Sequence, residues 1–370
     1  MLSKILLVAL GASMAAATTV DLNNYTFDKY LADFKLNFPA AELESRRATF
    51  LSELARVKAH NAKNLSWKEG MNKFSVLSSQ EKKAYMGLDA GVAQSQGKML
   101  KSAKPLPDNF VLKSASELPR EVDWRKKHVV SPVKDQGHCG SCWAFAATAT
   151  IESHVAIASG LLFELSPEQI AMCAPNPESC GGTGGCHGAT AEIGFEYVSN
   201  SDGLRSEYQY PYTSYYGEEF KCTMPDAPPA ATINGYVQLP SNNYTALLNA
   251  VAQVGPVSVS VDATTLHAYT SGIYDGCNQV NPDLNHAVVL VGYGEENGQK
   301  YWIMRNSWSP KYGEQGYIRI ARHDNEQEIC GIDVTPLHGS ACNGDNTPIT
   351  VCGTCGVLYH SAYPLNAKVV

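Results

Sequence analysis

The sequence predicts an α+β protein in which a helical half precedes a half rich in antiparallel strands, with a separate helical segment ahead of both. Three observations support this order. Residues 18–87 are charged, cysteine-free and helix-like, whereas cysteines, aromatic residues and glycines become frequent only after Leu118. Helical stretches follow over 142–160 and 167–173. From Val257 onward the chain has the alternation and turn signals of strands.

The N-terminus has the layout of a secretory signal peptide. One lysine precedes an apolar stretch over 5–12 and three alanines at 15–17. This stretch is too short to span a membrane; a buried N-terminal helix is the alternative interpretation. We expect a signal peptide over 1–17 and a protein of the secretory pathway, either lysosomal or vacuolar or extracellular. The net charge of −7 and the lack of a basic patch argue against nucleic acid as a partner, and no segment indicates a membrane partner.

The chain divides by composition into three further parts. Residues 18–87 have apolar side chains at helical spacing among arginines and glutamates, as in Phe50, Leu54 and Val57. Residues 88–117 lose this period and resemble an exposed linker, the usual place for proteolytic nicking. Residues 118–370 fit one compact domain. This order predicts a helical prosegment, a cleavable linker and a functional domain.

The first two cysteines, Cys139 and Cys142, form a C-x-x-C pair in a glycine-rich turn. Such a pair can bind zinc, act as a redox dithiol, or combine one structural with one reactive cysteine. An oxidising compartment favours disulfides. The chain has 11 cysteines, so at least one thiol is left over or pairs outside the chain.

Cys142 opens a predicted helix that ends near Gly160. The free N–H groups and the positive dipole end of a helix N-terminus favour a thiolate, so Cys142 is the better placed nucleophile of the two. Gln136, six residues earlier, can offer its side-chain amide to an oxyanion, together with the backbone N–H of Cys142.

A histidine and an asparagine flank a predicted hairpin. His286 begins "HAVVLVGYG", Asn306 ends "YWIMRN", and Asn297-Gly298 between them is a strong turn signal. This arrangement places the two side chains roughly opposite each other on paired strands. The asparagine carbonyl can then fix the imidazole, and Trp308 can shield that bond from water.

These motifs resemble those of the papain-like cysteine proteases, and within them the cathepsin L-like group. The stretches that carry the resemblance span residues 122–320; they are "VDWR", "PVKDQGHCGSCWAF", "SPEQIAMC", "GCHGA", "YPYTS", "GPVSV", "NHAVVLVGYG" and "RNSW…YGEQGYIRI". The resemblance implies a papain-like fold with a cleft between its two halves. It also implies Cys142 as nucleophile, His286 as acid/base, Asn306 as its orienting partner and Gln136 as oxyanion donor.

The N-terminal segment resembles the inhibitory propeptide of the same family. The long-helix motif falls on Glu42, Arg46, Phe50, Val57 and Asn61, with Glu53 where asparagine is usual. A second motif falls on Gly70, Asn72 and Phe74, with Val76 where an acid is usual. The resemblance implies a propeptide that runs backwards through the cleft and blocks it. The missing acid leaves the pH trigger of activation open.

The predicted cleft departs from the family pattern at several positions. Trp308 is followed by Ser309 where glycine is usual, and Tyr312 replaces a tryptophan. The resemblance implies that Gly140 and the pair Gly188-Ala189 contact the substrate backbone. It implies an S2 pocket for a hydrophobic side chain, formed by Thr190, Ala191, Leu284 and Ala287 with His360 at its base. We hypothesise that His360 makes selectivity depend on pH; a solvent-facing His360 is the alternative.

The resemblance implies three disulfides, Cys139–Cys186, Cys173–Cys222 and Cys277–Cys355. Cys180, Cys330, Cys342 and Cys352 are then extra, and three of them fall in an apparent insertion over 330–354. Cys277–Cys330 is an alternative third pair. A zinc site formed by Cys139/Cys142 and Cys352/Cys355 is the rival interpretation, although an oxidising compartment disfavours it.

The predicted function is that of a cysteine endopeptidase made as a zymogen and active at acidic pH, without metal or cofactor. Expected partners are peptide substrates, its own propeptide and cystatin-type inhibitors, and the protein is expected to be a monomer. Exopeptidases of the family carry extra blocking elements; no His-His loop follows "GCHGA" and the prosegment has no cysteine. The alternatives are an inactive binding or inhibitory protein on the same fold and a disulfide oxidoreductase.

Overall fold

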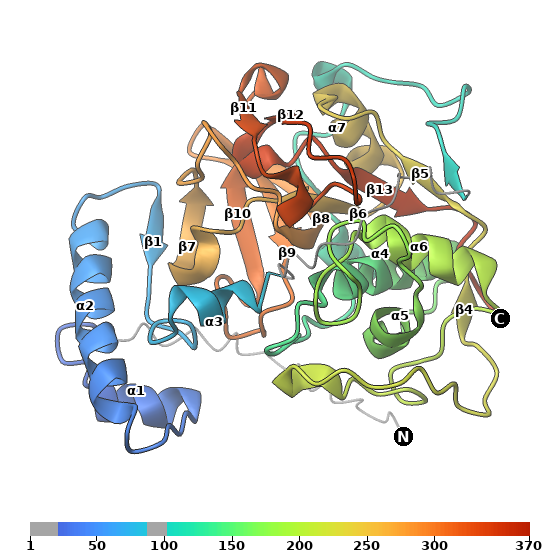
Figure 1. Cartoon of the computed structure of the whole chain (residues 1–370). Helices are drawn as coiled ribbons and strands as arrows, with labels where there is room; N and C mark the ends of the chain where they lie inside the picture. The colour runs from blue at the N-terminus through green and yellow to red at the C-terminus, as the bar shows by residue number, and fades with distance from the viewer. Residues whose placement is uncertain (1–20, 87–101) are drawn as a thin grey trace, which may run out of the picture.

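The computed structural model describes residues 21–86 and 102–370 of the chain. The predicted signal peptide over 1–17 and residues 88–101 of the predicted linker lie outside the described residues. An N-terminal segment lies against one side of a body that has a helical half and a sheet half (Figure 1). This is the α+β arrangement that the sequence predicts.

The N-terminal segment has a small aromatic core of its own. It contains α1 (Phe27–Phe34), α2 (Leu43–Asn61), β1 (Trp67–Glu69) and α3 (Ser79–Lys83). Tyr30 and Phe50 are fully buried where α1 and α2 meet. The helix α3 is capped by Ser78, whose hydroxyl accepts from the backbone N–H of Glu81. Strand β1 pairs antiparallel with β7, so the segment extends the sheet of the body.

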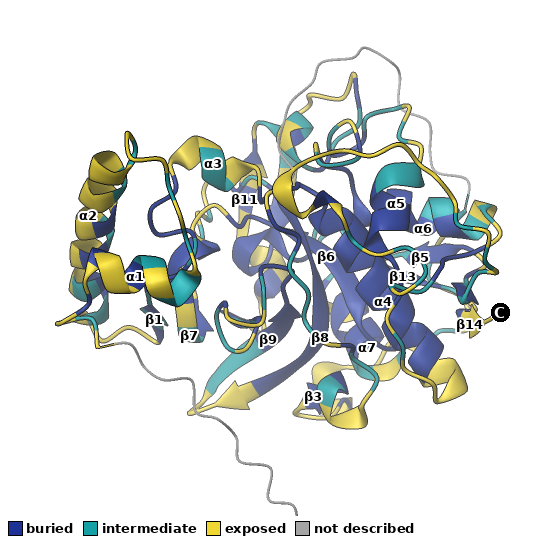
Figure 2. Ribbon diagram, turned by 90° about the horizontal axis from the view of Figure 1, so that it is seen from below, coloured by how far each residue is buried: buried dark blue, intermediate teal, exposed yellow. Residues whose placement is uncertain are grey.

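The helical half is built on one long buried helix. It contains α4 (Cys142–Ser159), α5 (Pro167–Cys173) and α6 (Ala191–Asn200). Helix α4 is buried from Cys142 to Ala156 and ends at Gly160, where φ is +76° (Figure 2). Helix α5 begins as predicted, because the Ser166 hydroxyl accepts from the Gln169 N–H and Pro167 takes the first turn.

The other half is a 10-stranded mixed sheet in the order β1-β7-β10-β9-β8-β6-β13-β5-β2, with β3 pairing β8 off this path. Most neighbours are antiparallel, as predicted, but β10–β7 and β2–β5 are parallel. The bounds are β2 (Ala103–Lys104), β3 (Val122–Asp123), β5 (Tyr236–Gln238), β6 (Val257–Val261), β7 (Tyr269–Tyr274), β8 (His286–Glu296), β9 (Gln299–Arg305), β10 (Tyr317–Ala321) and β13 (Ser361–Pro364). Asn297 and Gly298 form the predicted β8–β9 turn, both with positive φ.

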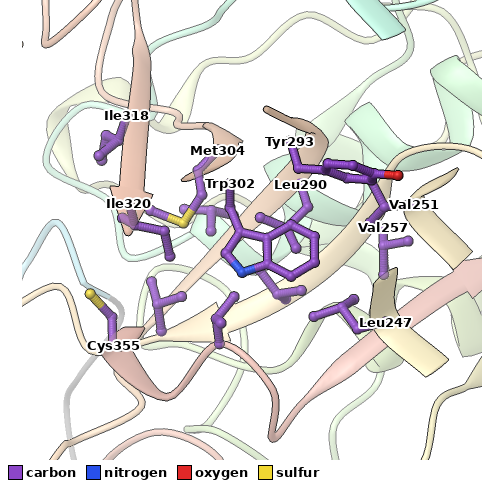
Figure 3. Packing of buried hydrophobic residues seen from close by; sticks show 14 of the residues in the cluster. Leu247, Val251, Val257, Leu290, Tyr293, Trp302, Met304, Ile318, Ile320 and Cys355 are labelled. Carbon is purple, nitrogen blue, oxygen red and sulfur yellow. The ribbon is translucent and has the colours of Figure 1, made fainter. Parts of the chain in front are cut away.

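The main core lies between this sheet and α7 (Tyr244–Gln253). Trp302 of β9 is fully buried there and is surrounded by side chains from β6, β8, β10 and α7 (Figure 3). Burying a large aromatic side chain contributes several kcal/mol, about 3–5 by truncation to alanine. The core therefore holds β8 and β9 rigidly, and these are the strands that carry His286 and lead to Asn306.

Two short strand pairs complete the fold. Strands β4 (Ala231–Thr232) and β14 (Lys368–Val369) pair near the C-terminus, and β11 (Cys330–Asp333) pairs with β12 (Ile349–Cys352) in the predicted insertion. Within the described parts of the chain, no helix has the length and apolar character that crossing a membrane requires.

Candidate active site

Cys142 lies at the first residue of α4 and is 3% exposed. Burial raises the pKa of its thiol to about 11, while the backbone N–H groups of Ala287, Trp143 and Cys142 itself act in the opposite direction. Its Sγ is 4.0 Å from the carbonyl oxygen of Met86 in the N-terminal segment. The thiol is thus set at a helix N-terminus, among donors that favour an anion, but is covered in this state.

His286 and Asn306 meet at one end of the β8–β9 hairpin. His286 Nε2 and Asn306 Oδ1 are 2.8 Å apart, and the Trp308 ring stacks on the imidazole with 4.6 Å between centroids. Burial lowers the pKa of His286 to about 4, although its bond to Asn306 raises it. Nδ1 is buried without a hydrogen-bond partner among the described residues, so it is the nitrogen left for a thiol.

The hairpin register differs from the simple expectation. Val289 pairs with Arg305, and the register shifts between Leu290 and Gly292. His286 and Asn306 are therefore not directly opposite each other on paired strands. Their side chains meet because Asn306 lies just beyond the end of β9, where it can reach diagonally to His286.

Gln136 is fully buried and held at both ends of its side-chain amide. Its Oε1 accepts from the Ser307 hydroxyl at 2.6 Å, and its Nε2 donates at 2.9 Å to the carbonyls of Tyr85 and Cys139. The amide orientation follows from these bonds, because only the NH₂ end can donate. The structure brings Gln136 to the same backbone stretch, 85–86, that covers Cys142.

The N-terminal segment fills the space between the two halves. The Tyr85 carbonyl accepts from Gln136 Nε2 and, at 3.3 Å, from Trp308 Nε1. Phe74 packs edge-on against Trp308, with 5.0 Å between centroids. Lys73 forms an ion pair of 2.6 Å with Asp135 of the body. Two consecutive peptide carbonyls of the chain's own N-terminal segment therefore occupy the positions beside Gln136 and Cys142.

The propeptide motifs have clear structural roles. Arg46 on α2 forms ion pairs with Glu42 at 2.8 Å and with Glu81 at 2.5 Å, and donates to the Val76 carbonyl. The Arg46 guanidinium lowers the pKa of Glu81 to about 2, so this link stays ionised in mild acid. Val76 itself is buried among apolar side chains, so the position where an acid is usual has become part of the small core.

The residues assigned to substrate binding lie on both halves. Thr190 is the N-cap residue of α6 and Ala191 begins that helix. Leu284 lies two residues before His286, the first residue of β8, and Ala287 follows it; all four are buried. His360 is half-buried just before β13, stacks on the Tyr359 ring, and its Nδ1 has no hydrogen-bond partner among the described residues.

The residues assigned to the substrate backbone lie on the helical half. Gly188 has φ of +83°, Ala189 follows it, and Gly140 forms a bridge with His187 beside them. A positive φ favours glycine at 188.

Ser309 and Tyr312, the two residues near Trp308 that differ from the family pattern, fit into the structure without disturbing their neighbours. Ser309 has φ of +87°, a conformation that favours the glycine usual there, and its hydroxyl accepts from the Lys311 N–H. Tyr312 is buried, packs edge-on against Trp308 at 5.1 Å, and donates to the Leu266 carbonyl at 2.5 Å. The wall around Trp308 thus remains closed and aromatic.

The structure forms five disulfides and leaves Cys142 as the one free thiol. The pairs are Cys139–Cys186, Cys173–Cys222, Cys277–Cys355, Cys180–Cys342 and Cys330–Cys352. The alternative Cys277–Cys330 pair is not formed. A zinc site from the two C-x-x-C pairs would need four thiolates, but Cys139, Cys352 and Cys355 are in disulfides. A redox dithiol of Cys139 and Cys142 would need a free Cys139, which the Cys139–Cys186 disulfide excludes.

Asp283, next to Leu284, is a half-buried acid beside the insertion, and its Oδ1 is buried without a hydrogen-bond partner among the described residues. Burial, and then the nearby Asp333 and Asp262 carboxylates, raise its pKa to about 7; a hydrogen bond from Asn285 opposes this. A raised carboxyl pKa contributes stability that is fully present below the ordinary value of 3.8 and is lost as pH rises through about 7. The structure therefore predicts that Asp283 makes the chain more stable in acid than at neutral pH.

Replacing Asp283 with asparagine is expected to remove the loss of folding stability that Asp283 causes as pH rises. The variant should be more stable than wild type by about 2 kcal/mol near neutral pH and equal to it at about pH 4. Denaturant unfolding of the full chain across this pH range measures the difference. Replacement of the exposed Asp226 by asparagine is the control. Parallel pH profiles for Asp283→Asn and wild type would show that Asp283 does not titrate as argued.

Comparison with known proteins agrees with this arrangement. The model "Papain family cysteine protease" matches residues 118–339, and "Cathepsin propeptide inhibitor domain (I29)" matches 27–81. Cysteine protease XCP2 of Arabidopsis thaliana is 36% identical over 83% of this chain and 83% of its own length. Pro-cathepsin H of Bos taurus is 35% identical over 88% of this chain and 91% of its own.

Solved precursor structures also superpose on the whole arrangement. A digestive procathepsin L 3 from Tenebrio molitor larval midgut has a TM-score of 0.72 and 32% identity, covering 91% of this chain and 97% of that one. A recombinant stem bromelain precursor has a TM-score of 0.71 and 30% identity, covering 92% and 97%. The fold and the N-terminal domain define a cysteine protease zymogen. The chain belongs to the papain family of cysteine proteases, which are hydrolases.

Proposed function

We propose that this protein is a cysteine endopeptidase whose catalytic groups are Cys142, His286, Asn306 and Gln136. The Cys142 thiolate attacks the substrate carbonyl, and His286 donates a proton to the leaving amine; water then releases the acyl-enzyme. Asn306 holds the imidazole ring, and Gln136 Nε2 with the Cys142 N–H stabilises the oxyanion. The observation that carries this proposal is the peptide backbone of residues 85–86, which already presents carbonyls to Gln136 Nε2 and Cys142 Sγ.

The covered state explains why the precursor is inactive. Burial raises the pKa of the Cys142 thiol and lowers that of His286, so both groups are neutral in the zymogen. Removal of the N-terminal segment returns water to the cleft. Water reduces the desolvation cost of a charged pair formed by the Cys142 thiolate and the His286 imidazolium. The helix N-terminus and the surrounding N–H groups remain to favour the thiolate.

The proposed division of the chain follows from this. Residues 1–17 are the signal peptide, 18–87 the inhibitory propeptide, 88–117 the region cut on activation and 118–370 the peptidase domain. Five disulfides fit an oxidising compartment, so we place the protein in the secretory pathway, in a lysosome or vacuole or outside the cell. Cystatin-type inhibitors are proposed partners, and the enzyme is proposed to act as a monomer at acidic pH.

Acid conversion of the purified proform tests this function. At neutral pH, iodoacetamide should fail to label the proform, because its one free thiol is buried. After mild acidification the chain should shorten, hydrolyse peptides with a hydrophobic residue at the second position, and take up one label on Cys142 with loss of activity. A shortened, labelled protein that hydrolyses no peptide would instead support an inactive binding protein.

His360 is expected to make S2 selectivity depend on pH. A protonated imidazole at the pocket base would favour acidic over apolar side chains. The ratio of kcat/KM for substrates with glutamate and leucine at the second position should rise severalfold on acidification of wild type. In His360→Ala this ratio should change less; identical profiles for the two proteins would remove the idea.

A further inference from the structure

A segment of the insertion, residues 336–343, connects the two halves of the protein; we call it the crossing segment. On the helical half it is anchored by the Cys180–Cys342 disulfide. The backbone N–H of Gly181 donates to the Ala341 carbonyl at 2.9 Å beside it. Figure 1 shows the chain between β11 and β12 extending from the sheet to the helical half.

On the sheet half the crossing segment packs directly on Leu284. A Cβ atom placed on Gly339 would lie 1.8 Å from the carbonyl oxygen of Leu284, so only a glycine fits this close approach. The segment is held at its base as well, because β11 and β12 pair and are joined by Cys330–Cys352. It is therefore anchored on both sides by contacts within residues 118–370.

Gly339 lies between the two walls assigned to the S2 pocket. It contacts Leu284 on the sheet side, as above. On the helical side, a Cβ placed on Gly181 would lie 2.7 Å from the Gly339 carbonyl oxygen, 2.8 Å from the Ala189 carbonyl carbon and 3.0 Å from Thr190 Cγ2. The Gly339 carbonyl is thus beside Thr190 while its backbone touches Leu284. The backbone of the crossing segment therefore bridges one residue of each wall.

We propose that the crossing segment closes the cleft beyond S2. A substrate then contributes at most two residues to the cleft on the N-terminal side of the scissile bond, and a longer chain must turn out of the cleft there. This inference rests on the proposed peptidase function and on the assignment of S2. Selectivity consequently comes from the two residues before the scissile bond and from those after it.

Two capped fluorogenic substrates test the inference on the acid-converted enzyme. One is acetyl-Leu-Arg-aminomethylcoumarin; the other adds two alanines before the leucine. An open cleft gains binding from the extra residues, whereas a closed one must exclude them. We expect wild type to cleave the longer substrate with a kcat/KM at least about tenfold lower than the shorter one.

The variant Cys180→Ser/Cys342→Ser releases the crossing segment from the helical half, and should cleave the two substrates within about twofold of each other. Cys330→Ser/Cys352→Ser, which removes the other disulfide of the insertion, is the matched control and should keep the wild-type ratio. The wild-type comparison needs no variant, so it remains decisive if a variant fails to fold.

Faster cleavage of the longer substrate by wild type would overturn the inference. An unchanged ratio in a folded Cys180→Ser/Cys342→Ser variant would also overturn it, since another element would then set the limit. If wild type cleaves neither substrate, the proposed peptidase function itself fails, which is a different result from cleavage without a length preference.

Discussion

Replacing Cys142 with alanine is expected to lower kcat for peptide hydrolysis by about 10⁴-fold or more, because the proposed acyl-enzyme forms on the Cys142 sulfur. Cys142 is the one thiol outside the five disulfides. It also lies where the helix N-terminus and nearby N–H groups favour its anion. Without the sulfur, His286 and Gln136 would still bind and polarise a substrate but would have no nucleophile to assist.

The measurement has to distinguish loss of peptide hydrolysis by the mature enzyme from failure to remove the propeptide. The variant cannot cut its own propeptide, so a trace of converted wild type is added in acid to remove it. Iodoacetamide then inactivates the wild type and leaves the variant untouched, because the variant has no free thiol. Cys142→Ser is the near-isosteric control for folding and should also be almost inactive. Activity of Cys142→Ala within tenfold of wild type would contradict the proposed mechanism.

The same alanine variant shows whether the propeptide stays bound in acid when it cannot be cut. Its prosegment should remain bound after acidification in the absence of added enzyme, because the Tyr85 contact with Gln136 does not involve the sulfur. The Arg46–Glu81 pair should also persist, since the pKa of Glu81 is lowered to about 2. An acid trigger of conversion would therefore have to act on other groups, since position 76 carries a valine where an acid is usual.

Local signals predicted much of this molecule from its sequence. The start of α5 follows from Ser166 and Pro167, whose effects need no distant contact. The β8–β9 turn follows from Asn297-Gly298 in the same way. The relation of His286 to Asn306 was predicted in outline, but its diagonal geometry was not, because the register shift depends on packing between strands.

Features that depend on distant partners were less accessible. Two pairs of neighbouring strands, β10–β7 and β2–β5, are parallel. The sequence did not indicate these pairs, because no turn connects their strands directly. The four extra cysteines could not be paired from sequence, since four cysteines allow three different connectivities. The crossing segment was missed for the same reason: its position follows from Cys180–Cys342, which joins residues 162 positions apart.

Replacing Gln136 with alanine is expected to be the next most damaging change, lowering kcat by about 10²-fold with little effect on KM. The Nε2 donor is aimed at a peptide carbonyl in the zymogen, at 2.9 Å from Tyr85 O. In the reaction the same donor would face an oxyanion, and a hydrogen bond to a charged acceptor is stronger than one to a neutral carbonyl. The loss therefore falls mainly on the transition state and appears in kcat.

Ser307→Ala is the matched control for this prediction. The Ser307 hydroxyl donates to Gln136 Oε1 at 2.6 Å and orients the amide without approaching the substrate. Its removal leaves the Nε2 donor in place, so kcat should fall by about tenfold or less. Gln136→Ala should also weaken inhibition by added propeptide, because the Tyr85 carbonyl loses a donor. A drop in propeptide affinity with unchanged kcat would show that Gln136 serves only to bind the prosegment.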